Sequence, residues 1–169
     1  MTKYSLADIK KMVDELALKI NAPTNLLPTY NHIIGDATPC IEVGNNGFLF
    51  YVISERGEEY SRKKTDKIDD LLYWIFASVT FEMSCAYELK NRIEDKDCRR
   101  IMFNKQEELL GQLNETWMER EQAEHQNILK SFPFDDLAGL RAIFWRKLRE
   151  QGYSEKKCEK LAYEKYPKN

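Results

Sequence analysis

The densest run of apolar positions lies between Phe48 and Tyr87, and within it the spacing changes from that of a strand to that of a helix. Phe48–Ile53 is rich in aromatic and β-branched residues and follows the turn sequence Asn-Asn-Gly, which is typical of the second arm of a β-hairpin. Pro39–Val43 supplies the first arm. From Ile68 to Ala86 the apolar residues recur at helical spacing, so this segment is predicted to be a long helix that is buried on most sides.

The charged stretch between this strand and this helix is predicted to be a connection. Glu55-Arg56-Gly57 ends the strand, and the run Glu58–Lys64 leads to Thr65-Asp66. There a residue suited to cap a helix is followed by acidic side chains, which favour a helix N-terminus.

Helical periodicity also marks the two ends of the chain. Ser5–Ile20 is amphipathic, whereas Asn21–Thr38 contains prolines and asparagines and is predicted to be a loop or a short extended piece. A second long helix, antiparallel to the first, is expected from Cys98 to the break at Phe132–Asp135, and two shorter helices follow. The expected fold class is α+β, with a small antiparallel sheet packed against a mainly antiparallel helix bundle.

Length and composition indicate one folded domain. A chain of 169 residues with 43% hydrophobic residues can build a single core, so we expect one domain over residues 1–169. Its net charge of −2 indicates neither a nucleic-acid partner nor a membrane surface. The longest apolar run is shorter than a membrane span, and the N-terminus lacks a secretory signal, so we expect a cytoplasmic protein.

Charge is distributed unevenly along the helices. The second long helix is predicted to present an acidic outer face, formed by Glu107, Glu108, Glu115, Glu119, Glu121 and Glu124. From residue 135 onward the chain becomes basic, but Lys, Arg and Glu alternate there, which is more typical of solvated helix faces than of a nucleic-acid interface.

The sequence lacks the common signatures of metal and phosphate chemistry. Its four cysteines, Cys40, Cys85, Cys98 and Cys158, form no CxxC pair and are expected to be reduced thiols in or near the core. His32 and His125 lie in no metal-binding frame, and there is no glycine-rich phosphate loop or nucleophile elbow. We therefore expect neither a metal nor a cofactor.

One catalytic pattern is present in a weak form. Arg120 and His125 match the loose Arg-x4-6-His signature of helical HEPN ribonucleases. Residues five apart on an α-helix point about 140° apart, and Glu121 beside the arginine would repel a phosphate, so chance is the favoured explanation.

Two charged clusters are candidates for a site. Loops at the end of a hairpin often hold binding residues, so the first cluster is either a recognition surface or a solvated turn. The second is interpreted as an ion-pair network that fixes the two long helices, with a binding site as the alternative. The first comprises Glu55, Arg56, Glu58, Glu59 and Arg62; the second comprises Glu88, Arg92, Asp97, Arg99 and Arg100.

The order of several short motifs resembles the immunity protein 63 family. These motifs are Leu26-Leu27-Pro28-Thr29-Tyr30, Ile41-Glu42-Val43, Glu55-Arg56-Gly57 with Glu59, Leu71-Leu72-Tyr73-Trp74, Tyr87-Glu88-Leu89 with Arg92, and Asp97 with Arg99-Arg100, Phe103, Gln106 and Leu109-Leu110. The resemblance covers roughly Leu26 to Phe134 and leaves the basic C-terminal region outside it.

The resemblance implies a function in which this chain is not an enzyme. Members of the family are encoded beside toxins of bacterial polymorphic toxin systems and are expected to neutralise them, so it implies a toxin domain as the partner. The candidate contacts are the first charged cluster together with Glu115, Glu119 and Glu121. Other family-pattern positions are interpreted as structural: Gly57, Trp74, Glu88, Arg92, Asp97, Arg99, Arg100 and Gln106. A HEPN-like ribonuclease and a general protein-interaction scaffold stay open as alternatives.

Overall fold

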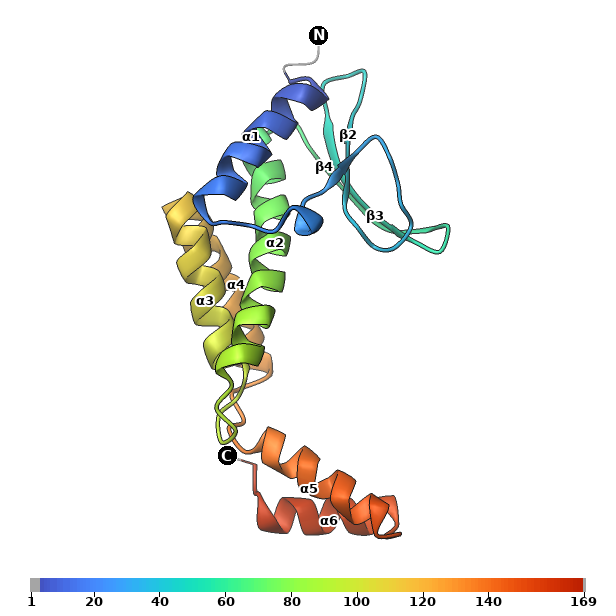
Figure 1. Ribbon diagram of the computed structural model, residues 1–169, viewed down its shortest axis with the longest axis vertical. Helices are drawn as coiled ribbons and strands as arrows, with labels where there is room; N and C mark the ends of the chain where they lie inside the picture. Colours follow the sequence, from blue (N-terminus) through green and yellow to red (C-terminus); the bar gives the residue numbers. More distant parts are fainter. Residues whose placement is uncertain (1–3, 169) are drawn as a thin grey trace. The chain divides into compact units, whose positions relative to one another are not determined.

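The computed structural model describes residues 4–168, which form an α+β fold (Figure 1). The α+β class predicted from the sequence is confirmed. The elements in chain order are α1 (Leu6–Lys19), the short 3-10 helix η1 (Thr24–Leu26), β1 (Thr29–Tyr30), β2 (Cys40–Val43), β3 (Leu49–Glu55), β4 (Glu58–Thr65), α2 (Ile68–Asn91), α3 (Arg99–Leu113), α4 (Glu115–Ser131), α5 (Ala138–Glu150) and α6 (Glu155–Lys165).

These elements pack as two compact units. The first contains residues 4–83 and Gln106–Glu121; the second contains Ser84–Lys105 and residues 122–168. The boundary falls within helices α2, α3 and α4. The expectation of one domain stays a prediction.

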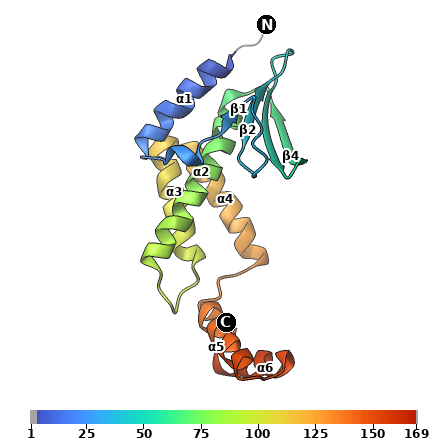
Figure 2. The ribbon, with the colours of Figure 1, turned by 45° about the vertical axis from the view of Figure 1, so that its right-hand side comes forward.

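The sheet of the first unit is mixed, in the strand order β1-β2-β3-β4 (Figure 2). The predicted hairpin is confirmed, because β2 pairs antiparallel with β3 from Cys40 opposite Val52 to Val43 opposite Leu49. The expectation of a purely antiparallel sheet was wrong, since β1 pairs parallel with β2.

Strand β4 corrects the prediction of a charged connection after Gly57. Glu58–Thr65 pairs antiparallel with the whole of β3. Its side chains are mostly exposed, so the strand has no apolar alternation by which the sequence could reveal it.

The core of the first unit lies between the sheet and helices α1 and α2 (Figure 1). Ser5 caps α1 by accepting a hydrogen bond from the Asp8 N–H, and Ile9 and Val13 are fully buried. Thr65 ends β4 and accepts a hydrogen bond from the Lys67 N–H, which turns the chain into α2 as predicted. Phe76 stacks on Trp117 with 6.2 Å between the ring centres.

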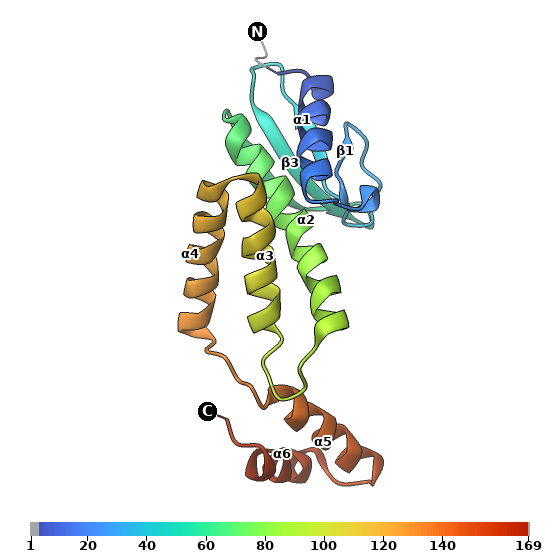
Figure 3. The same ribbon diagram turned by 60° about the vertical axis from the view of Figure 1, so that its left-hand side comes forward.

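The second long helix predicted from Cys98 is in fact two antiparallel helices, α3 and α4 (Figure 3). The break lies at Asn114, whose side chain accepts a hydrogen bond from the Thr116 N–H at 2.9 Å. Leu109, Leu110 and Trp117 are buried on both sides of the break, so the apolar stripe continues through a reversal of the chain. The acidic face expected along one helix is therefore divided between two.

The second unit has a smaller core. Helices α5 and α6 pack together (Figure 3). Leu148, Cys158 and Ala162 are their buried residues, and Ser154 caps α6. Cys40 and Cys158 are buried free thiols, but Cys98 is exposed at the entrance to α3. The expectation that Cys98 belongs to the core was wrong.

Candidate functional site

The β3–β4 hairpin turns through two residues, Arg56 and Gly57. Their φ angles are 51° and 85°, the pair of positive values that a tight hairpin turn requires. Glycine adopts such an angle without strain, which explains the family-pattern glycine at this position. Arg56 and Glu58 are exposed at the tip.

Arg62 neutralises much of the charge behind this turn. Its guanidinium donates to Glu59 at 2.8 Å and to Glu42 at 2.7 Å. The hydrogen bonds from Arg62 lower the pKa of Glu59, which stays ionised. Glu55 lies 3.6 Å from Arg56. Two of the three carboxylates of the predicted cluster, Glu55 and Glu59, therefore already have a cation beside them.

Two acidic residues of α4 have no such partner. Glu115 and Glu119 are exposed and make no ion pair or side-chain hydrogen bond within residues 4–168. They stand four residues apart on one helix, where like charges repel. No ion pair within residues 4–168 therefore neutralises the negative charge of Glu115 and Glu119.

Glu121 does not share this outward face. Its carboxylate accepts a hydrogen bond from the Tyr73 hydroxyl at 2.7 Å and another from the Gln106 amide at 3.1 Å. The expectation that Glu121 forms part of an exposed acidic face was wrong, because this side chain lies on the same side of α4 as the buried Trp117.

Gln106 is only 2% exposed and links α3 to α2 as well as to α4. Besides Glu121, its amide donates to the Ala77 carbonyl at 3.1 Å. Trp74 is half-buried, with the Lys63 ammonium 5.5 Å from its ring. Gln106, Trp74 and Gly57 thus lie at packing or turn positions of the first unit.

The remaining family-pattern residues are in the second unit. Glu88 is buried, and its carboxylate accepts two hydrogen bonds from Arg92 one turn later, which lower the pKa of Glu88. Asp97 is also buried and caps the first turn of α3 through the Arg99 N–H at 3.0 Å. The predicted network therefore divides into the Glu88–Arg92 pair and a second group that contains Asp97, Arg99 and Arg100.

Asp97, Arg99, Arg100 and Asp136 form a clasp between the start of α3 and the segment that joins α4 to α5. The Asp97 N–H donates to the Asp136 carboxylate at 3.0 Å, and the Asp135 N–H donates to the Asp97 carboxylate at 2.9 Å. Arg99 also donates to the carbonyls of Phe132 and Pro133. Arg100 donates to Asp136 at 2.7 Å.

Electrostatics stabilise this clasp. Burial tends to raise the pKa of Asp97, but the hydrogen bonds from Arg99 and the backbone outweigh it, so the pKa of Asp97 is lowered. Hydrogen bonds from Arg100 and the Asp97 N–H lower the pKa of Asp136 to about 2. The clasp borders a groove of about 680 Å³ whose walls mix both signs of charge with small apolar residues.

Arg120 and His125 have contacts of different kinds. The Arg120 guanidinium lies 3.9 Å from the Tyr73 ring centre and donates to Asp70 at 3.2 Å. His125 is 4% exposed and stacks on Phe103 at 3.8 Å between ring centres. Arg120 belongs to the first unit and His125 to the second. Each side chain therefore takes part in the packing of its own unit.

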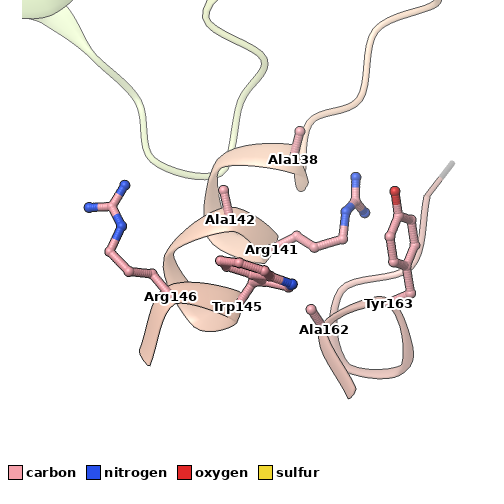
Figure 4. A pocket seen from close by; sticks show the side chains of 7 residues that line it. All are labelled: Ala138, Arg141, Ala142, Trp145, Arg146, Ala162 and Tyr163. Carbon is pink, nitrogen blue, oxygen red and sulfur yellow. The ribbon is translucent and has the colours of Figure 1, made fainter. Parts of the chain in front are cut away.

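A shallow pocket of about 360 Å³ lies between α5 and α6 (Figure 4). Arg141 lines it but is buried, donating to the Tyr166 carbonyl at 2.6 Å and to the Asp135 carboxylate. Trp145 and the exposed Arg146 complete one wall. Since Arg141 is held by the fold, Arg146 is the cation of this pocket that stays open to solvent.

Two properties of the described residues bear on other classes of site. Within residues 4–168, no group of three or more His, Cys, Asp or Glu side chains is arranged to hold a metal ion. In the same part of the chain no helix is long and apolar enough to cross a bilayer.

Comparison with known proteins agrees with the resemblance seen in the sequence. Residues 45–127 match the family model described as immunity protein 63. The matched stretch includes the hairpin turn, Asp97 with its neighbours, and the acidic pair on α4. No curated protein and no solved structure matches the chain.

Proposed function

We propose that this chain, whose residues 45–127 match immunity protein 63, binds a cognate bacterial toxin domain and neutralises it stoichiometrically. The family match is the observation that carries the proposal. The toxin belongs to a polymorphic toxin system, and binding in the cytoplasm protects the producing cell. The chain acts as an inhibitor and not as an enzyme.

The acidic pair Glu115 and Glu119 is the contact that the geometry supports best. Both carboxylates are exposed and form no ion pair within residues 4–168, so their field extends into solvent. Toxins that act on nucleic acids need basic clefts to hold phosphate, and such a cleft is attracted to an unneutralised acidic helix. Complementary charge of this kind accelerates association and orients the encounter.

The β3–β4 turn is the other candidate contact. Its charges are largely compensated, because Arg62 holds Glu59 and Glu42 and Arg56 lies beside Glu55. A compensated surface contributes little long-range attraction, although it can still provide short-range contacts. Glu58 and Glu59 therefore serve as the comparison site in the experiment.

The experiment measures the association rate between the purified chain and the toxin domain encoded beside it. In the double variant Glu115→Lys with Glu119→Lys, we expect association at low salt to slow by about tenfold or more. The matched control is Glu155→Lys with Glu159→Lys. These residues have the same types, spacing and position at the start of helix α6 and are also exposed.

The outcomes separate the two surfaces. Slower association in the α4 variant alone supports the acidic pair, whereas slower association only after Glu58→Lys with Glu59→Lys would assign the contact to the hairpin turn. If both variants and the control associate like the wild type, neither surface is the contact. If co-expression of the wild type fails to protect cells from the toxin, the function itself is wrong.

A further inference from the structure

Strand β4 is an open edge of the sheet. The strand order places it last, and no other strand within residues 4–168 pairs with its outer side (Figure 2). Its eight residues are exposed except for Ser61 and Thr65. Along such an edge every second residue points its N–H and C=O away from the sheet, where another strand can pair with them.

The charges along β4 are ordered. The strand begins with Glu58 and Glu59 and continues through Arg62, Lys63 and Lys64. When a copy of this strand is reversed beside it, the acidic half of each lies opposite the basic half of the other. A parallel copy would place like charges together, which is unfavourable.

We propose that a second copy of this chain pairs with β4 about a two-fold axis, so that the two sheets join edge to edge. Charge complementarity selects this partner. Charged side chains and a bulge make an open edge unfavourable for pairing with unrelated strands. The acidic-then-basic order of charges along β4 is complementary to the same strand in the reversed direction, so pairing with a second copy is favourable. This surface is separate from the acidic pair on α4.

A bulge determines the register. Ser61 lies opposite Ile53 and Glu59 lies opposite Ser54, so Tyr60 is the extra residue of β4. Arg62 therefore shares a face of the sheet with Glu59, to which it is hydrogen-bonded. Lys63 points to the other face, where its ammonium lies 5.8 Å from the Tyr51 ring.

With Ser61 opposite Ser61 of the second copy, each of the four charges nearest the axis meets its opposite on the same face. Glu59 then lies opposite Arg62 of the second copy, and Glu58 opposite Lys63 of the second copy. The two-fold axis repeats both contacts. Tyr60, which is 64% exposed, stands beside the axis and would bury its ring against the second edge.

The test is the oligomeric state in sedimentation equilibrium. The wild type should reach twice its monomer mass of 20.0 kDa as its concentration rises. A basic-edge variant, Glu58→Lys with Glu59→Lys, and an acidic-edge variant, Arg62→Glu with Lys63→Glu, should each dimerise about tenfold or more weakly, because like charges then face each other. Mixed in equal amounts, the two should form a heterodimer.

Three results would overturn the proposal. The wild type could stay monomeric into the millimolar range, either variant measured alone could dimerise like the wild type, or the mixture of the two folded variants could stay monomeric. If a variant fails to fold, the wild-type measurement still tests whether the chain dimerises. Glu155→Lys with Glu159→Lys, which changes the charge equally outside β4, should dimerise like the wild type. Dimerisation is measured on this chain alone, and toxin binding is measured with the toxin domain present, so either proposal can fail alone.

Discussion

Replacing Asp97 by alanine should strongly destabilise the second unit. The Asp97 carboxylate caps α3 through the Arg99 N–H, pairs with the Arg99 guanidinium at 2.6 Å and accepts the Asp135 N–H. Loss of a cap costs about 1 kcal/mol. Removal of the buried acceptor, which leaves the Arg99 Nε–H and the Asp135 N–H unsatisfied, costs about 2 kcal/mol more.

The sum of about 3 kcal/mol corresponds to a fall in melting temperature of about 6 to 12 °C for a chain of this length. Circular dichroism and calorimetry at neutral pH measure it. Asp97→Asn keeps an oxygen acceptor but loses the charge, so its melting temperature should lie between those of the wild type and Asp97→Ala.

Asp95→Ala is the control, because Asp95 is exposed and makes no ion pair or side-chain hydrogen bond within residues 4–168. This variant should melt within about 2 °C of the wild type. If Asp97→Ala also melted like the wild type, the clasp would not stabilise the fold. The charged family-pattern residues would then need a different explanation, such as contact with a partner.

Three further predictions concern the turn, acid and the thiols. Gly57→Ala should lower the free energy of unfolding by about 1 kcal/mol because φ is 85° there, whereas Gly139→Ala, inside a helix with space for a methyl group, should not; urea titrations compare them. Because the pKa of Asp136 is about 2 in the folded chain and 3.8 without its partners, its contribution is complete above pH ~4 and is lost as the pH falls toward ~2. In Asp136→Asn the melting temperature should therefore fall less steeply than in the wild type as the pH is lowered from ~4 to ~2. Chelator and reductant should leave the melting temperature unchanged, and a sharp fall with either would reveal a metal or a disulfide.

The elements that the sequence predicted are those that bury one or more apolar faces. The β2–β3 hairpin and helix α2 were visible because aromatic and aliphatic residues recur at strand and helix spacing. Strand β4 was missed because an exposed edge has no such alternation. The signal available in the sequence was Gly57, a residue typical of turns, followed by the β-favouring residues Tyr60 and Thr65.

The break at Asn114 was hidden by a continuous stripe. Leu109 and Trp117 both reach the same core, although the chain reverses between them. Asn114 followed by Glu115 is a capping sequence that could have indicated a new helix.

The candidate site was predicted only in part. The position of Glu121, four residues after the buried Trp117, could have revealed that it faces inward. The clasp could not have been found in this way, because Asp136 meets Asp97 across a long separation in sequence and no local pattern encodes that contact.

Titration of the purified chain with the toxin domain encoded beside it tests the central claim most directly. Calorimetry with an inactive toxin variant would give the stoichiometry and the affinity together. We expect a saturable complex with one toxin domain per chain, with affinity that falls as salt rises. Absence of any complex at micromolar concentrations would contradict the proposal that this chain is an immunity protein for that toxin.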